Sequence, residues 1–175
     1  QTDTLPAIGC MPEFAEIIYK LKKREKNKAL ILMGSDVSQL LSYVHQLAKS
    51  DFMKMAEQFW PGPLTLITPL SDEKKPTINF NININTLGLR VPNSITAKSL
   101  ISETGPLATS SANISGLSTS STATQVSKDL PGLDLLGPIP WEKCSGKAST
   151  IISWAGKGKW QLIRRGQIII PSIDK

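Results

Sequence analysis

Basic side chains crowd the stretch KLKKREKNK, residues 20–28, immediately before a short apolar run. A charge run of this kind is more often a solvated helix end than a site. Here, however, the run falls where a helix should lead into a buried strand, so a cation at the junction can face a crevice. Lys22 and Arg24 could therefore hold two anions close together, one as a compact charge and one as a planar fork.

A second stretch, PLATSSANISG at residues 106–116, offers hydroxyl groups and one amide without any charge. Ser111 and Asn113 follow a predicted strand, where neutral groups of this type can bind phosphate oxygens or a ribose. On composition alone, a turn with local side-chain caps is the simpler interpretation.

Arginines in apolar surroundings are a third feature. Arg90 lies within LGLRVP, and a buried arginine needs a structural carboxylate or an anionic ligand. Arg164 and Arg165 precede Gly166 at the end of a predicted hairpin, where loops often line sites. The sequence has no P-loop, GxGxxG element or paired carboxylates. These features favour a reaction that holds anions together and stabilises charge, such as phosphoryl or nucleotidyl transfer.

Hydrophobic periodicity predicts the elements that must position these residues. We expect helices over 12–24, after Ser35 or Asp36, and over 51–59 and 96–103, and strands over 29–34, 64–68, 87–91 and 106–110, with a final hairpin turning at 156–159. The helix over 12–24 is expected to bury Phe14, Ile17, Ile18 and Leu21. The alternating run INFNININ, 78–85, fits an edge strand, although a loop is the simpler account. This mixture predicts an α/β domain built on a mixed sheet.

Composition narrows the class of protein. The net charge of +6 favours polyanionic partners, and no apolar run is long enough to cross a bilayer. No signal peptide is visible, so we expect a cytoplasmic protein whose Cys10 and Cys144 stay reduced. A single histidine, His45, argues against a Ser-His-Asp triad and a zinc site. Because the sequence opens without Met, we also expect an upstream segment to be missing.

The chain resembles the YrdC-like family of threonylcarbamoyl-AMP synthases in its single-domain form. QTDTLPAIGC is similar to the family's Pro-Thr-Asp/Glu-Thr opening, and LKKREKNKALIL to its Lys-x-Arg-x-x-x-Lys-x-Leu segment. Five further blocks follow in order: WPGPLTLI, LGLRVPN, PLATSSANISG, ASTIIS and LIRRGQI. The chain departs from the family at Gln1, at Pro6–Gly9 and at Glu25, where Pro, Tyr-Gly-Leu-Gly and Pro are usual.

The resemblance implies one YrdC-like domain over residues 1–175, an open twisted sheet with flanking helices and a concave basic face, lacking its N-terminal strand. It implies an enzyme that makes threonylcarbamoyl-AMP from L-threonine, bicarbonate and ATP, with Mg²⁺ carried on the ATP phosphates and no protein metal site. The product would serve a downstream transferase that modifies tRNA.

The resemblance also implies roles for individual residues. Lys22 and Arg24 would offset the reacting charges, with Lys28 assisting. The remaining substrate-binding positions would be Thr2 for threonine, Ser111 and Asn113 for nucleotide and phosphate, Ser149 with Arg164 or Arg165 on the nucleotide side, and Arg90 in either role. Two alternatives stay open: a non-catalytic module that binds double-stranded RNA, tRNA or the ribosome, and a paralogue acting on another carbamoyl phosphate-type substrate.

Overall fold

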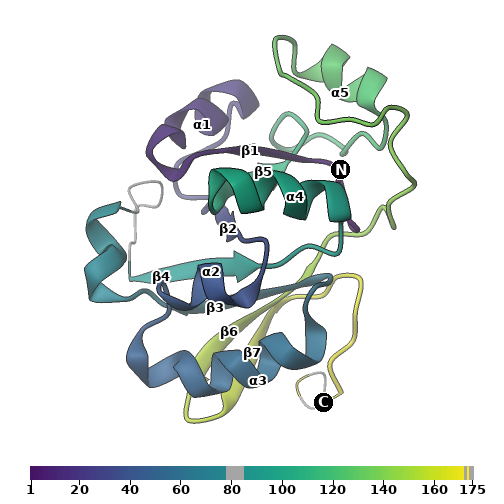
Figure 1. Cartoon of the computed structure of the whole chain (residues 1–175). Helices are drawn as coiled ribbons and strands as arrows, with labels where there is room; N and C mark the ends of the chain where they lie inside the picture. The colour runs from purple at the N-terminus through teal and green to yellow at the C-terminus, as the bar shows by residue number, and fades with distance from the viewer. Residues whose placement is uncertain (78–84, 172, 174–175) are drawn as a thin grey trace.

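A mixed β-sheet forms the centre of the computed structural model, which describes residues 1–77, 85–171 and 173 (Figure 1). Within these residues seven strands pair in the order β1-β5-β2-β4-β3-β6-β7. Their bounds are β1 Ala7–Cys10, β2 Ile31–Met33, β3 Leu64–Pro69, β4 Thr86–Arg90, β5 Leu107–Ser111, β6 Thr150–Gly156 and β7 Lys159–Arg164. The pairs β2–β4 and β3–β6 are parallel and the other four are antiparallel. The predicted mixed α/β sheet is confirmed.

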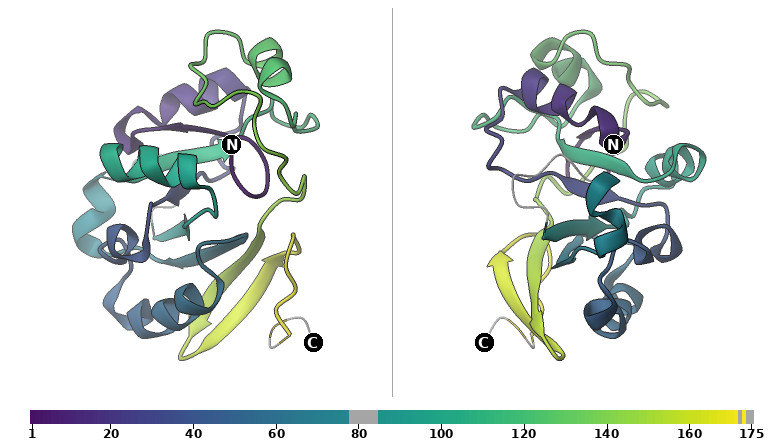
Figure 2. Two further views of the ribbon diagram at one scale, coloured as in Figure 1. Left: turned by 45° about the vertical axis from the view of Figure 1, so that its right-hand side comes forward. Right: turned by 90° about the vertical axis from the view of Figure 1, so that its left-hand side faces the viewer.

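Helices flank this sheet. They are α1 Glu16–Lys22, α2 Val37–Leu41, α3 Lys49–Phe59, α4 Ile95–Thr104 and α5 Ala123–Asp129, with 3₁₀ turns at Pro12–Phe14, Gln46–Ala48 and Asp72–Thr77. Of the two predicted caps, Ser35 and Asp36, it is Asp36 that caps α2, by accepting the Gln39 N–H. Strand β1 and the β6–β7 hairpin lie at opposite ends of the sheet (Figure 2).

Alternation along the strands separates a core face from an open face. On the core face, Leu32, Leu66 and Leu89 are fully buried and pack in one cluster with Ile18 of α1 and Phe52 of α3. The intervening residues project to the other side, because successive strand side chains point to opposite faces. Helix α4 covers part of that second face through Ile101, which packs on Met33 and Leu107. The rest of the face is left for a pocket.

The predicted helix over 12–24 is wrong in extent, and its apolar face is only partly buried. A 3₁₀ turn precedes α1, and Phe14 and Ile17 are more than half exposed, whereas Ile18 is buried and Leu21 packs partly buried against the core. The buried side of α1 also carries Tyr19 and Lys22. Periodicity points to the apolar side chains, whereas the folded chain also buries a lysine whose ammonium group finds oxygen acceptors.

Three other expectations can be compared with the structure. The hairpin turn at 156–159 is confirmed by the pairing of Gly156 with Lys159. Cys10 and Cys144 are both free thiols, and burial raises the pKa of Cys10. The alternating run over 78–85 lies outside the described residues except for Asn85. Among the helices described, none combines the length and apolar character that a membrane span requires.

Candidate active site

A pocket of about 330 Å³ lies on the open face of the sheet. All seven strands contribute to its lining, and the pocket-facing side chains include Thr109, Ile31, Arg90, Thr65, Ile151 and Arg164, from β5, β2, β4, β3, β6 and β7 respectively. These positions are cross-strand neighbours: Ile31 pairs with Thr109, and Ile151 pairs with Thr65 and with Arg164. The period-2 pattern of the strands therefore selects which residues reach the pocket.

The charged side chains that line this pocket are all positive. Its described lining includes Arg24, Arg90 and Arg164 and contains no aspartate or glutamate. Ser111, Ser149 and several threonines add hydroxyl side chains to the same lining. A cavity with three fixed cations and neutral donors is suited to anionic ligands.

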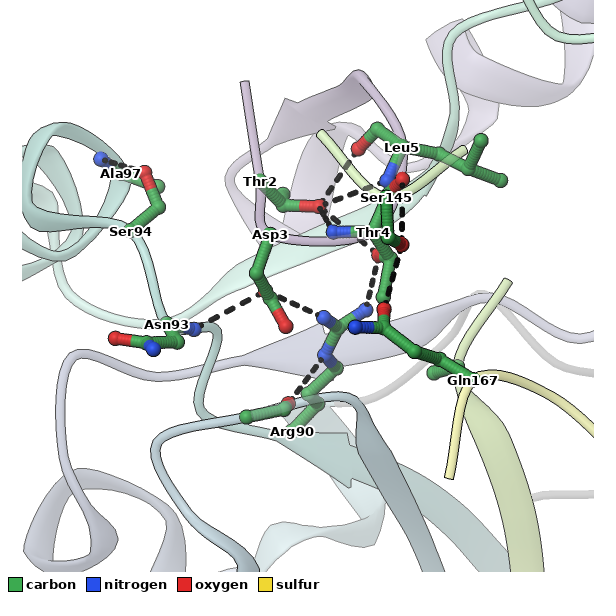
Figure 3. Close-up of polar contacts among 12 residues, drawn as sticks. Thr2, Asp3, Thr4, Leu5, Arg90, Asn93, Ser94, Ala97, Ser145 and Gln167 are labelled. Carbon is green, nitrogen blue, oxygen red and sulfur yellow. Dashed lines mark hydrogen bonds and ion pairs between the residues drawn. The ribbon is translucent and has the colours of Figure 1, made fainter. Parts of the chain in front are cut away.

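Arg90 fixes the N-terminal segment, residues 1–6, along one wall of the pocket (Figure 3). Its Nη1 donates to Thr4 Oγ1 at 2.9 Å, its Nη2 to Asp3 Oδ1 at 2.6 Å, and its Nε to the Gly62 carbonyl at 3.0 Å. Burial lowers the pKa of Arg90, and the charge of Asp3 opposes that shift. The sequence predicted that a buried Arg90 needs a structural carboxylate or an anionic ligand, and Asp3 supplies the carboxylate.

Sequence reasoning missed both Asp3 and Thr4. Nothing local marks Asp3 as the partner of a residue 87 positions away. The available signal was that both lie inside the QTDTLPAIGC block, next to the predicted Thr2.

Thr2 lines the pocket, but its hydroxyl group is engaged within its own turn. Its Oγ1 donates to the Leu5 carbonyl at 2.6 Å and accepts the N–H groups of Thr4 and Leu5, each at 3.3 Å. Such a turn fixes the backbone of the segment locally. The structure therefore places Thr2 at the wall of the pocket with its hydrogen-bonding capacity already used.

The two predicted clusters, around Lys22 and around Ser111, lie together. The ammonium group of Lys22 donates to the Ser111 carbonyl, to the Asn113 carbonyl at 2.6 Å and to Asn113 Oδ1 at 3.1 Å. Ser111 Oγ donates to the same Oδ1 at 2.6 Å. Lys22 is 1% exposed, and burial followed by the nearby charge of Arg24 lowers its pKa to about 8. Ser111 lines the pocket, whereas Lys22 and Asn113 stand behind it.

Arg24 and Lys28 have different surroundings. Arg24 lines the pocket and is oriented by the carbonyls of Lys28 and Ala29, which accept from Nε and Nη2, both at 2.9 Å. The ammonium group of Lys28 is exposed and pairs with Glu25 at 3.2 Å. Glu25 thus pairs with Lys28, and Lys28 is not among the residues that line the pocket.

The structure also separates Arg164 from Arg165. Arg164 Nη2 donates to the Ser149 carbonyl at 2.8 Å and to Ser149 Oγ at 3.3 Å, and Ser149 Oγ in turn lies 2.9 Å from Thr65 Oγ1. Arg164 lines the pocket, but Arg165 does not. Close approach of the chain at Gly166 holds this arrangement, since a Cβ there would lie 2.3 Å from the Ser149 carbonyl carbon.

The pocket offers little to a bare metal ion. Across the part of the chain that the structure describes, no group of three or more His, Cys, Asp or Glu side chains could hold one. Divalent cations such as Mg²⁺ prefer oxygen ligands and often bind through substrate phosphates.

Comparison with known proteins gives consistent matches. The family model Sua5_yciO_yrdC, described as Telomere recombination, matches residues 1–166. A curated protein of Methanocaldococcus jannaschii is 36% identical over 181 residues, which cover 99% of this chain and 81% of that protein. The threonylcarbamoyl-AMP synthase of Aliivibrio fischeri is 30% identical over 135 residues, 74% of this chain and 71% of the relative.

Solved structures agree with these matches. The H234A/Y235A variant of P. abyssi Sua5 superposes with a TM-score of 0.84 at 28% identity over 98% of this chain. P. abyssi Sua5 complexed with L-threonine gives 0.81 at 29% identity over 94%. This chain spans about half the length of those two proteins, 52% and 48% respectively.

Proposed function

This chain belongs to the Sua5–YciO–YrdC family, and we propose that it is a nucleotidyltransferase that makes threonylcarbamoyl-AMP from L-threonine, bicarbonate and ATP with release of pyrophosphate. The observation that carries the proposal is a pocket lined by three arginines and no carboxylate, beside the turn that contains Ser111 and Asn113. A curated relative bears the name threonylcarbamoyl-AMP synthase.

The chemistry explains why such a pocket needs cations. The threonine amine forms a bond to the carbon of bicarbonate with loss of water, and the resulting carbamate oxygen attacks the α-phosphorus of ATP. The bond between the α-phosphorus and the bridging oxygen breaks, and pyrophosphate leaves with that electron pair. Nucleophile and electrophile are both anionic, so fixed guanidinium groups lower the repulsion between them and stabilise the charge that develops.

Arg90 suits the carboxylate of the amino acid. The contacts among described residues use three of its five N–H groups, one on each nitrogen, which leaves one on Nη1 and one on Nη2. Its depth in the pocket favours a small ligand, and the relative P. abyssi Sua5 has been solved with L-threonine. We place threonine against Arg90, Thr4 and Ser149.

The triphosphate then lies toward the more exposed arginines. Arg24 and Arg164 have guanidinium N–H groups beyond those bonded to backbone carbonyls, and Ser111 lies on the same lining. Mg²⁺ would enter on the phosphate oxygens. Lys22 contributes indirectly by holding the turn of Ser111 and Asn113. A downstream transferase would receive the product and act on tRNA.

Pyrophosphate release tests this proposal. The purified chain, supplied with ATP, Mg²⁺ and bicarbonate, should release pyrophosphate when L-threonine is added, and threonylcarbamoyl-AMP should be detected by mass spectrometry. Omission of bicarbonate or replacement of threonine by alanine is the control. Pyrophosphate release at the same rate without threonine would contradict the proposed reaction.

A further inference from the structure

Asp3 is the one carboxylate that contacts a pocket arginine among the described residues, and it does so from outside the pocket. Its Oδ1 accepts from Arg90 Nη2 at 2.6 Å and from the Asn93 N–H at 3.1 Å. Asp3 lines a separate cleft on the other side of the N-terminal segment, beside Ser94 and Trp141. Asp3 is not among the residues that line the arginine-lined pocket, but it is bonded to Arg90, which is.

The orientation of Arg90 depends on three acceptors from different parts of the chain. Gly62 supplies a carbonyl for Nε, Thr4 a hydroxyl for Nη1 and Asp3 a carboxylate for Nη2. The carbonyl and the hydroxyl are neutral, so the carboxylate provides the charge-assisted bond, which is the strongest of the three kinds. Arg90 is 3% exposed, so the loss of a charged partner would leave its buried guanidinium group poorly compensated.

Asp3 also ties the wall of the pocket to the sheet. The backbone of the same segment is held by the Ser145 N–H, which donates to the Asp3 carbonyl at 3.1 Å, and by Ser94 Oγ, which donates to the Gln1 carbonyl at 3.0 Å. The Asp3 side chain adds a link from this segment to the backbone N–H of Asn93 (Figure 3). One carboxylate thus fixes both the wall and the guanidinium group that faces the ligand.

We propose that Asp3 is a positioning residue, which acts through Arg90 to hold the guanidinium N–H groups in place for the carboxylate of the amino-acid substrate. This inference rests on the proposed function. It predicts an effect confined to the amino acid, because the ATP side of the pocket is built from Arg24, Ser111 and Arg164, which Asp3 does not contact.

Asp3→Asn removes the negative charge of the side chain and keeps its shape. Asp3 Oδ2 is buried and has no hydrogen-bond partner among the described residues, so the amide nitrogen can occupy its place while Oδ1 stays as the acceptor. Asp51→Asn is the matched control, because Asp51 Oδ2 also accepts two N–H groups, from Trp154 at 2.9 Å and Gly158 at 2.6 Å, and does not line the pocket.

Initial rates with the full chain give the test. Asp3→Asn should raise the KM for L-threonine about tenfold and leave the KM for ATP within about twofold of wild type. Asp51→Asn should change neither. A purely structural role would lower only the maximal rate, because KM does not depend on how much of the enzyme is folded. A threonine KM equal to that of Asp51→Asn would overturn the proposal.

Asp3→Glu covers the case in which the asparagine variant does not fold. It keeps the charge of the ion pair but moves the carboxylate by one methylene, so the threonine KM should still rise, by about threefold or more. An unchanged threonine KM in a folded glutamate variant would also overturn the role of Asp3. Absence of threonine-dependent pyrophosphate from the wild type would instead reject the proposed function, so the two failures are distinguishable.

Discussion

The ammonium group of Lys22 lies 2.6 Å from the carbonyl oxygen of Asn113 and 3.1 Å from its side-chain Oδ1. This contact joins two segments that are 91 residues apart in sequence. A backbone hydrogen bond also joins these segments, since the Ser115 N–H donates to the Lys22 carbonyl at 2.8 Å. The basic segment and the hydroxyl-rich turn are therefore one structural unit on the edge of the pocket.

Replacement of Lys22 by Met tests this unit. The change removes the donor of the Asn113 carbonyl, whereas the Ser111 carbonyl still accepts from the Asn113 N–H and Asn113 Oδ1 still accepts from Ser111 Oγ. A buried group left unsatisfied costs about 1–3 kcal/mol, so we expect the free energy of unfolding, measured with urea, to fall by about that amount. Lys20→Met, on the exposed side of the same helix, is the control. Equal unfolding midpoints for the two variants would mean that Lys22 does not hold the turn.

Wild type and Lys22→Met should also differ in how their stability depends on pH. The pKa of Lys22 is lowered from 10.5 to about 8, so between these values the unfolded chain holds a proton that the folded chain has released. Unfolding then takes up a proton, and rising pH favours the folded state. The stability of wild type relative to Lys22→Met should therefore increase between about pH 8 and about pH 10.5, by at most about 1.4 kcal/mol per pH unit. Urea unfolding at several pH values measures this difference, and a flat or falling difference would contradict it.

The strands could be predicted because their signal is local. Short apolar runs and period-2 alternation identified β2, β3, β4, β5 and the final hairpin, and the same alternation explains why Thr65 and Thr109 reach the pocket. The burial of Lys22 on α1 could not be predicted in this way. It depends on oxygen acceptors that β5 and its following turn bring to Lys22, and no pattern within 12–24 encodes them.

The sequence predicted which residues could form the candidate site, but it did not predict the contacts among them. Sequence reasoning selected Arg24, Ser111 and either Arg164 or Arg165, and of these Arg24, Ser111 and Arg164 line the pocket. It also selected Lys22, whose ammonium group is taken up by protein oxygens. Residue type and spacing identify which groups can bind anions, but long-range packing decides which of them face the ligand.

Arg164 and Arg165 can be distinguished by mutation. Arg164 lines the pocket and is bonded to Ser149, whereas Arg165 is outside the lining. Arg164→Ala should lower kcat/KM for ATP by about tenfold or more, because a hydrogen bond to a charged group is worth about 1.5–3 kcal/mol. Arg165→Ala should stay within about twofold of wild type. The opposite ranking of the two variants would place Arg165 on the nucleotide instead.

Gly166→Ala tests the backbone that supports Ser149. The added Cβ would lie 2.3 Å from the Ser149 carbonyl carbon and 2.4 Å from both the Ala148 oxygen and the Thr150 nitrogen. Backbone atoms cannot yield as a side chain does, so we expect a loss of at least about 2 kcal/mol in unfolding free energy and reduced activity. Gly137→Ala, whose Cβ would meet nothing closer than 3.9 Å, is the control. Comparable stability of both variants in thermal unfolding would argue against close packing at Gly166.

Within the basic segment, we expect substitutions of Arg24 and Lys28 to differ most in their effect on activity. Arg24 faces the pocket with a guanidinium group held by two backbone carbonyls, while Lys28 extends to solvent and pairs with Glu25. Arg24→Ala should lower kcat/KM about 100-fold or more, since it removes a fixed cation from the reacting charges. Arg24→Lys should recover only part of this loss, because an ammonium group lacks the planar fork.

Lys28→Ala is the matched control for that series. It removes an exposed ion pair, which contributes at most about 1 kcal/mol, and keeps the Lys28 carbonyl that accepts from Arg24 Nε. Its kcat/KM should therefore stay within about threefold of wild type in the pyrophosphate assay. If Lys28→Ala were as impaired as Arg24→Ala, the lysine would have to reach the triphosphate, and its pairing with Glu25 would be broken when ATP binds.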